Sequence, residues 1–190
     1  MQFAAGLEFG LAVGVGVLIR VAEPGDLDGL GEALGPEHRD FFRNRFPIQQ
    51  AGLGEILVAC GDAGPVGAVF LFWGPADEPE IRRHLADVPM MFHLHVSPEH
   101  RHRGVGRSLL RRAEENLRAR GHTRVLLGVN KSNKVARALY EWLGYTQPPE
   151  PALSNLGATT EPGAGGHPVG ETYDILVADL LRPAPAWPSS

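Results

Sequence analysis

The sequence is poor in cysteine: Cys60 is the only one in 190 residues, so no disulfide can form within the chain and nothing requires an oxidising compartment. A long hydrophobic run is also lacking. The apolar stretch at residues 9–19 is too short and too rich in glycine to span a bilayer, and no basic residue precedes it as in a secretion signal. We therefore expect a cytoplasmic protein with no membrane segment, in which this stretch leads into the first strand.

Lysine is scarce as well, with two residues against sixteen arginines in a chain rich in Ala, Gly and Pro, which is typical of a GC-rich bacterial genome. The formal charge is −8 over residues 1–100, +8 over 101–146 and −4 over 147–190. The basic segment favours either a binding site for a small polyanion or an arginine-rich helix exposed to solvent. Because it is short and lies mostly on one predicted helix, we expect no nucleic-acid partner.

The composition, with 43% hydrophobic and 21% charged residues, is that of a folded globular protein, and the length suits one domain. We expect residues 1–182 to form that domain and residues 183–190 to be a proline-rich tail. Residues 147–170, crowded with Pro, Gly, Ser and Thr, are expected to form a long loop of the functional or disordered kind.

The hydrophobic pattern predicts an alternation of strands and helices. Glycines at 35, 121 and 144 are expected to end helices, and the turn residues at 61–65 are expected to join a hairpin. The predicted strands are 17–21, 55–60, 66–73, 90–96, 123–129 and 171–180, and the predicted helices are 26–34, 36–45, 105–117 and 133–143. This order indicates an α/β (α+β) protein with a mixed central sheet flanked by helices.

The most informative stretch, residues 94–108, joins a predicted strand to a predicted helix. Gly104 and Gly106 allow backbone amides to turn toward a ligand without a Cβ in the way, and the positive end of the helix dipole points to the same place. Such a turn suits a pyrophosphate. Two glycines before a helix are by themselves a weak signal, because they are more often only a turn.

A second motif makes the signal specific. Arg101-x-x-Gly104-x-Gly106 resembles the acyl-CoA pyrophosphate motif of the GNAT superfamily of N-acetyltransferases. Residues 133–145, which read Asn-x-x-Ala-x-x-Leu-Tyr-x-x-x-Gly-Tyr, resemble the motif that follows it in that family, with a strand between the two as in the family. The resemblance covers residues 90–146 and implies the GNAT fold.

The resemblance further implies an enzyme, an acetyl-CoA-dependent N-acetyltransferase with acetyl-CoA as acyl donor. By position, Tyr140 would be the catalytic acid that protonates the departing thiolate, and Asn133 would hydrogen-bond the pantetheine arm. The strand at 94–96 would pair with pantetheine and supply an amide to the thioester oxygen, and loop amides would bind the pyrophosphate. The implied cofactor-binding residues are Leu94, His95, Val96, Arg101, His102, Arg103, Gly104, Val105, Gly106, Arg107, Ser108 and Asn133.

The sequence departs from the family where a general base is expected. Gly128 stands where ribosomal-protein N-terminal acetyltransferases place a glutamate, which argues against ribosomal substrates. Met90 and Phe92 stand where histone-type and arylalkylamine-type members place a glutamate or histidines. The sequence therefore leaves the base unidentified.

Histidines lie close to the vacant base positions. Strict alternation along the strand places His93 and His95 on the face opposite Phe92 unless a bulge intervenes, so we interpret them as partly exposed or hydrogen-bonded strand residues. Together with His100 and His102 they could also suggest a metal site. Zinc requires a third and fourth ligand in defined geometry, and the last two histidines fall in the phosphate loop, so no metal is expected.

The acceptor pocket in this family lies between the early helices and the last hairpin. Here that region is Pro36–Gln50, with Phe41, Phe42 and Phe46, facing the 147–170 loop. We expect direct transfer to a primary amine of a small molecule, and the charge of −12 outside the basic segment favours a cationic one. The alternatives are a peptide or protein N-terminal acetyltransferase and a non-catalytic acyl-CoA-binding sensor, and a homodimer is compatible with the sequence.

Overall fold

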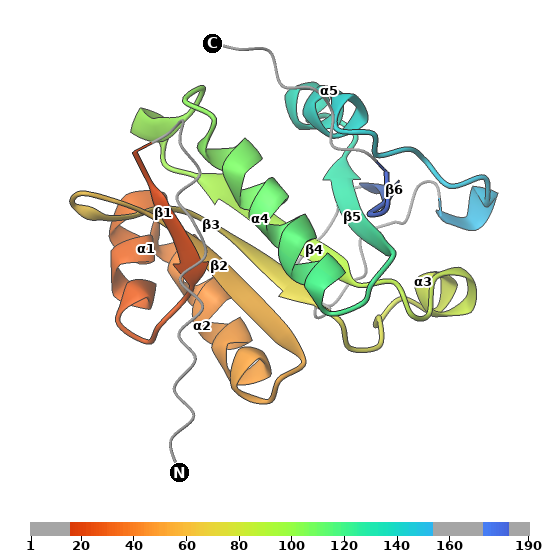
Figure 1. Ribbon diagram of the computed structural model, residues 1–190, viewed down its shortest axis with the longest axis horizontal. Helices are drawn as coiled ribbons and strands as arrows, with labels where there is room; N and C mark the ends of the chain where they lie inside the picture. Colours follow the sequence, from red (N-terminus) through yellow and green to blue (C-terminus); the bar gives the residue numbers. More distant parts are fainter. Residues whose placement is uncertain (1–15, 154–172, 183–190) are drawn as a thin grey trace.

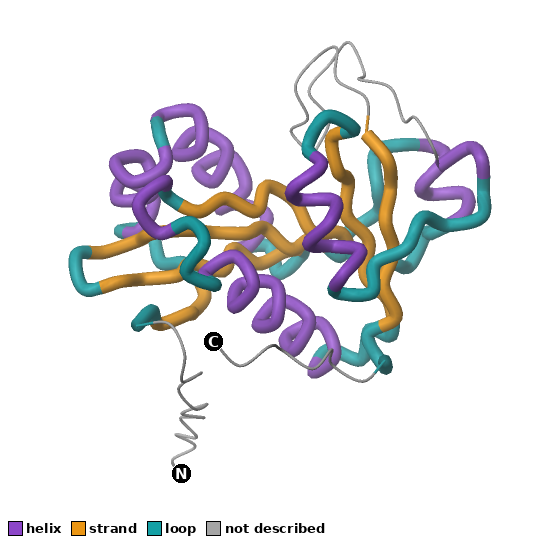
Figure 2. Tube along the Cα trace, turned by 90° about the horizontal axis from the view of Figure 1, so that it is seen from above, coloured by secondary structure: helices purple, strands orange, loops and turns teal. Residues whose placement is uncertain are grey.

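Six strands form one sheet in the order of the sequence, with helices on both faces (Figure 1 and Figure 2). The computed structural model describes residues 16–153 and 173–182. Neighbouring strands are antiparallel except β4 and β5, which run parallel and are joined through a helix. The strands are β1 (Leu18–Val21), β2 (Gly54–Gly61), β3 (Gly64–Phe72), β4 (Met90–Val96), β5 (Arg124–Asn130) and β6 (Tyr173–Asp179). The mixed sheet predicted from the sequence is confirmed.

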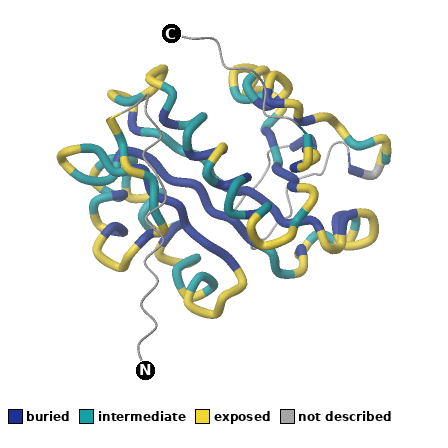
Figure 3. Tube along the Cα trace, in the orientation of Figure 1, coloured by how far each residue is buried: buried dark blue, intermediate teal, exposed yellow. Residues whose placement is uncertain are grey.

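The helices cover the two faces of the sheet in two groups. One face is packed by α1 (Asp26–Leu34), α2 (Pro36–Gln50) and α3 (Pro79–His84), the other by α4 (Val105–Ala119) and α5 (Lys134–Trp142). Two separate apolar cores result, because side chains of the central strands point alternately to the two faces. Figure 3 shows these strands as the most deeply buried part of the chain.

Two predictions about helices are corrected by the structure. The second helix does not end near residue 45 but continues to Gln50, although Pro47 in its last turn lacks the N–H that would bond to the carbonyl of Arg43. The connection after β3 contains α3, which the sequence pattern did not indicate. Six residues make less than two helical turns, too few for the apolar positions to show a repeat. The lead-in at 1–15, most of the predicted 147–170 loop and the tail at 183–190 lie outside the described residues.

Helix α4 carries a clear amphipathic pattern. Its buried apolar residues Val105, Leu109, Ala113 and Leu117 lie four apart and form one stripe against the sheet. The helix begins after Gly104 and its last turn closes before Gly121, and these two glycines have left-handed φ values of 83° and 87°. Since non-glycine side chains resist that conformation, both helix ends are fixed by residue type.

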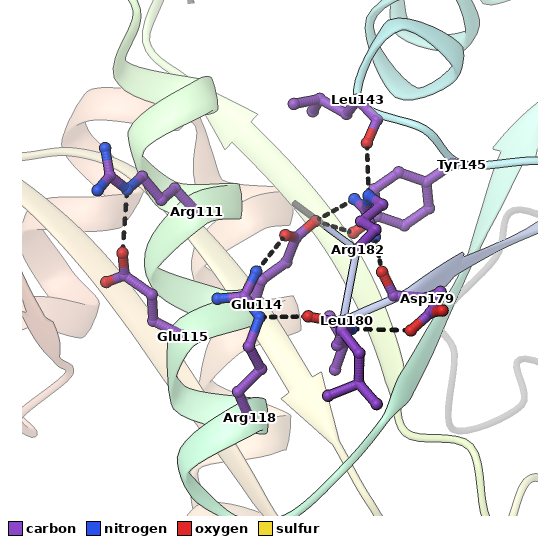
Figure 4. Close-up of polar contacts among 10 residues, drawn as sticks. Arg111, Glu114, Glu115, Arg118, Leu143, Tyr145, Asp179, Leu180 and Arg182 are labelled. Atoms are coloured by element: carbon purple, nitrogen blue, oxygen red, sulfur yellow. Dashed lines mark hydrogen bonds and ion pairs between the residues drawn. The ribbon is translucent and has the colours of Figure 1, made fainter. Parts of the chain in front are cut away.

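A buried carboxylate on α4 ties this helix to the last strand. Glu114 accepts hydrogen bonds from the Tyr145 hydroxyl at 2.9 Å, from Arg182 at 3.0 Å and from Arg118 at 3.1 Å (Figure 4). Arg118 and Arg182 also donate to the carbonyl oxygens of Leu180 at 2.6 Å and Leu143 at 3.0 Å. A buried carboxylate needs such partners to offset its lost hydration, so the network fixes α4 against the segments that follow α5 and β6.

Candidate active site

Strands β4 and β5 pair only over the first two residues of β4. Met90 pairs with Leu126 and Met91 with Leu127, and β4 then continues to Val96 without further pairing to β5. On its other side β4 stays paired with β3, up to the Gly67 and Val96 pair. Among the described residues, the backbone of residues 94–96 therefore has no strand partner on the β5 side, and a ligand with amide groups can take that place.

The loop before α4 is built for close backbone approach. His102 and Gly104 both have left-handed φ values, 58° and 83°, and residues 101–103 are exposed. The first intrahelical bond of α4 runs from the Ser108 amide to the Gly104 oxygen at 2.9 Å, so the amides of Val105 and Gly106 precede the hydrogen-bonded turns of the helix. No acidic residue lies in the first turn of α4. An anion is favoured at such a helix start.

The unpaired strand end and the helix start adjoin each other. A Cβ built on Gly106 would lie 3.6 Å from a Val96 methyl and 3.9 Å from a Leu94 methyl, and both side chains pack on the α4 side of the sheet. These are ordinary contact distances, so packing within the protein does not demand glycine at position 106. The Arg101 Nε donates to the Val96 oxygen at 3.1 Å and holds the loop against the strand end. The predicted donor residues on β4 and on the loop thus share one location.

Tyr140 lies on α5 with only 9% of its surface exposed. Burial raises the pKa of its phenol to about 12, and its ring centroid is 5.8 Å from that of Tyr145. Unlike Tyr145, it has no hydrogen-bond partner for its hydroxyl among the residues that the structure describes. A phenol in this state keeps its proton at neutral pH and can give it to a strong base that forms nearby.

Asn133 has a structural role that the sequence did not indicate. Its side-chain oxygen accepts a hydrogen bond from the Ala136 amide at 3.0 Å, so it is the N-cap of α5. The side-chain NH₂ group remains as a donor for a ligand. The predicted contact of Asn133 with pantetheine therefore stays a prediction, restricted to that amide nitrogen.

A β-bulge intervenes at His93 and His95, which is the exception that the sequence analysis allowed to strict alternation. Ala68 pairs with His95 and Phe70 with Phe92, so β4 has one residue more than β3 between these pairs. His93 takes a left-handed φ of 57° at the bulge. The extra residue turns both histidines to the face that carries Phe92, toward α2, and leaves Leu94 and Val96 on the α4 face.

A third histidine, which the sequence analysis did not single out, completes a cluster on this face. His38 on α2 lies with its Nδ1 2.8 Å from the Nε2 of His93, and its ring centroid is 4.1 Å from that of His95. The side-chain nitrogens of these three residues lie within 4.8 Å of one another, close enough for one metal ion to reach all three. His100 does not join them, because its Nδ1 pairs with the Ser97 hydroxyl at 2.8 Å.

The predicted acceptor region on α2 is split between core and site. Phe42 is fully buried in the core, whereas Phe41 stacks on the His93 ring at 3.8 Å with an angle of 11°. The Arg45 guanidinium lies over the Phe41 ring, with its carbon 4.8 Å from the ring centroid. Helix α2 therefore faces β4 through Phe41 and His38.

Comparison with known proteins identifies the class to which this fold and site belong. Residues 29–145 match the family model of the acetyltransferase (GNAT) family, which covers more than half of the chain. The chain therefore belongs to the GNAT acetyltransferase family. Human N-acetyltransferase 8 is 33% identical over 82 residues, which are 43% of this chain and 33% of that protein. The match thus spans about a third of the length of this curated relative.

Solved structures share the fold at low sequence identity. An acetyltransferase from Salmonella typhimurium, solved with its cofactor acetyl-CoA, superimposes with a TM-score of 0.63 at 18% identity, covering 91% of this chain and 99% of that one. Spermidine N-acetyltransferase from Vibrio cholerae, solved with CoA and spermine, gives a TM-score of 0.61 at 16% identity, covering 87% of this chain and 96% of that one.

No helix among the described residues is long and apolar enough to cross a membrane.

Proposed function

We propose that this chain uses acetyl-CoA to acetylate a primary amine of a small molecule by direct transfer. The observation that carries the proposal is the end of β4, where the backbone of residues 94–96 is unpaired toward β5 and adjoins the exposed start of α4. The strand end offers the amide pairing that a pantetheine arm needs, and the helix start presents its first amides to a pyrophosphate. Arg101 and Arg103 add positive charge at the same loop.

The residues of the site fit acetyl-CoA, which supplies the acetyl group as a thioester. Residues 102–107 would hold its pyrophosphate through their amides, and residues 94–96 would pair with its pantetheine arm. An amide of this strand would donate to the thioester oxygen, where negative charge develops as an amine adds to the carbonyl carbon. Such a preplaced donor contributes a few kcal/mol, about 3 in measured cases, to lowering the barrier.

The transfer forms one bond and breaks one. The nitrogen lone pair of the amine forms the new N–C bond, and the C–S bond breaks with its electron pair passing to sulfur. Tyr140 gives its phenol proton to that sulfur and is reprotonated from solvent, while the amine loses one proton to a base. Atoms and charge balance without any covalent intermediate on the enzyme.

The acceptor side supports a small molecule over an extended peptide. Helix α2 lies across the face of β4 that carries the histidine cluster, with Phe41 in direct contact with His93. An extended peptide needs an open strip of sheet, which α2 covers on this face, whereas a compact amine does not. The spermidine N-acetyltransferase of the same fold gives a precedent for such an acceptor.

A panel of amines, monitored by release of free CoA thiol, tests the proposal. The panel should contain polyamines, arylalkylamines, amino acids and short peptides with a free N-terminus, with acetyl-CoA alone as the background. Turnover is expected with at least one small amine. Tight binding of acetyl-CoA without turnover of any amine would favour the non-catalytic sensor, and faster turnover of peptides would favour N-terminal acetylation.

Cys60 is expected not to carry an acetyl group during turnover. It lies next to the last residue of β2, and β2 is two strands away from β4 in the sheet. At about 4.8 Å per strand this separation is roughly 10 Å. Burial raises the pKa of its thiol, so little of the nucleophilic thiolate forms at neutral pH. Mass spectrometry of the protein mixed with acetyl-CoA should show no rapid labelling of Cys60, and Cys60→Ala should retain wild-type turnover. Labelling at the rate of turnover would contradict direct transfer.

A further inference from the structure

The three histidines between α2 and β4 form a compact group of rings. The centroid of the His93 ring is 4.9 Å from that of His38 and 4.4 Å from that of His95. His38 and His93 share a hydrogen bond of 2.8 Å between Nδ1 and Nε2, so one of these nitrogens donates and the other accepts. Two titratable rings are thus in direct contact at the bulge of β4. Residues 94–96, which are proposed to bind the acetyl donor, follow directly after it.

His93 is held in a conformation that a side chain adopts at a cost. A left-handed φ costs a non-glycine residue roughly 1–2 kcal/mol, so packing must oppose it. Phe41 stacks on one side of the His93 ring at 3.8 Å, and Phe42 meets it edge-on at 5.5 Å. These contacts and the bond to His38 fix the ring at the bulge. Residues strained in this way are concentrated at functional sites.

The surroundings favour the neutral form of two rings of the cluster, those of His38 and His95. Burial, reinforced by the proximity of His38, lowers the pKa of His95 to about 4, and burial lowers the pKa of His38 below its usual value. Among charged neighbours, the Arg101 guanidinium lowers the pKa of His38 further and the Glu37 carboxylate opposes this. On α2, Arg45 lies beyond the Phe41 ring. A neutral imidazole has a free lone pair and can accept a proton.

A path to solvent leads from the pair. The His38 Nε2 lies 3.5 Å from the Glu37 carboxylate, whose side chain is 70% exposed, while the His38 side chain itself is 15% exposed. A proton accepted by His93 can therefore pass through the shared hydrogen bond to His38 and leave at Glu37. The order from the interior to the surface is His93, His38, Glu37.

We infer that the His38 and His93 pair is the proton acceptor that the sequence left unidentified: His93 takes the proton released by the amine, and His38 passes it to solvent. This inference rests on the proposed function. As the N–C bond forms, the amine nitrogen loses one proton to the His93 lone pair, and His38 releases one proton at its Nε2. The pair returns to neutrality, and no net charge accumulates in the site.

The distance within the pair favours a hydrogen bond over a metal ion. Two imidazole nitrogens bound to one tetrahedral zinc at about 2.05 Å each lie roughly 3.3 Å apart. The His38 and His93 nitrogens are closer, at 2.8 Å, which is the length of a hydrogen bond. Metal-bound histidines also usually donate their other nitrogen to a fixed carboxylate or carbonyl, whereas the carboxylate beside His38 is exposed.

His93→Asn is the sharpest test, because asparagine tolerates the left-handed backbone of position 93 but cannot accept the proton. With the best amine from the panel, we expect kcat/KM to fall about 10²-fold at pH 7 and the affinity for acetyl-CoA to stay within two-fold. The wild-type rate should fall toward acid pH as the pair becomes protonated. In His93→Asn this fall should disappear, leaving only the pH dependence of the amine itself, which all variants share. His122→Asn, in the turn after α4, is the matched control and should keep the wild-type profile.

Two further measurements complete the test. His38→Gln can keep a hydrogen bond to His93 but cannot relay a proton. Turnover should therefore fall about 10-fold, and its decline toward acid pH should change. This variant serves as the test if His93→Asn does not fold. Nitrogen NMR of labelled histidines in the full chain should show His38 and His93 titrating as a pair, and His38 titrating differently in His93→Asn.

The outcomes separate this inference from the proposed function. Turnover with an unchanged pH profile in both variants would overturn the role of the pair and leave the acetyltransferase intact. No turnover of any amine by the wild type would overturn the proposed function and this inference with it. Stoichiometric Zn²⁺ binding by calorimetry, lost in His93→Asn, together with loss of turnover on chelation, would identify a metal site in place of the proton acceptor.

Discussion

Tyr140→Phe is expected to lower turnover about 10²–10⁴-fold while the affinity for acetyl-CoA stays within two-fold. The hydroxyl would act on charge that develops only as the thioester breaks, so its loss affects the transition state and not the bound donor. Because burial raises the pKa of Tyr140 to about 12, the phenol is protonated at every pH below about 10, and the factor should not change with pH in that range. Steady-state rates with the best amine and calorimetry with acetyl-CoA measure the two quantities.

Tyr145→Phe is the matched control, since its ring lies beside that of Tyr140 but its hydroxyl donates to Glu114. Removing a hydrogen bond to a charged group typically costs about 1.5–3 kcal/mol of stability, so this variant should unfold at a lower temperature and keep its turnover. Equal falls in turnover and thermal stability in Tyr140→Phe would assign Tyr140 a structural role. Turnover near the wild-type value would leave water as the proton donor to the thiolate.

Gly104→Glu is expected to weaken acetyl-CoA binding about 10²-fold or more, which corresponds to roughly 3 kcal/mol. The new side chain would place a negative charge and added bulk at the helix start that is proposed to receive the pyrophosphate. It would also hold a non-glycine residue at a φ of 83°. Calorimetric titration with acetyl-CoA measures the effect directly and needs no acceptor.

Gly121→Glu controls for the strain in that experiment. Position 121 has nearly the same φ, 87°, at the other end of α4, and a Cβ there meets nothing within 4 Å. The same substitution then costs similar backbone strain, about 1–2 kcal/mol, without approaching the donor loop. If both variants kept the wild-type affinity, the pyrophosphate would lie elsewhere. If both lost it equally, the loss would come from destabilised structure and not from the site.

The architecture was largely predictable from local patterns. The α4 stripe and the glycines at its ends lie in one continuous segment, so the periodicity alone indicates the helix. The loop from Arg101 to Gly106 is equally local, and its placement between a strand and a helix follows from the same pattern. Helix α3 escaped prediction because its six residues contain less than two turns of periodic signal.

The acceptor side could not be predicted, because it depends on one bulge and one long-range contact. Side chains of a strand alternate between its two faces. A single inserted residue at His93 therefore reverses the face of the side chains from that point to the end of β4. No local pattern indicates where such a residue is inserted. His38 lies 55 positions away in sequence, and only the packing of α2 across β4 brings it to His93.

The sequence by itself determined the family, the donor loop, the strand and helix order and the candidate acid Tyr140, because each rests on residue types at short, fixed spacing. Only the tertiary structure decided which side chains of β4 face α2, how Asn133 is engaged and which histidines meet. These features depend on strand register and on how the helices pack. A shift of one residue in register, or a different position of one helix, changes every such contact but leaves the local sequence pattern unaltered.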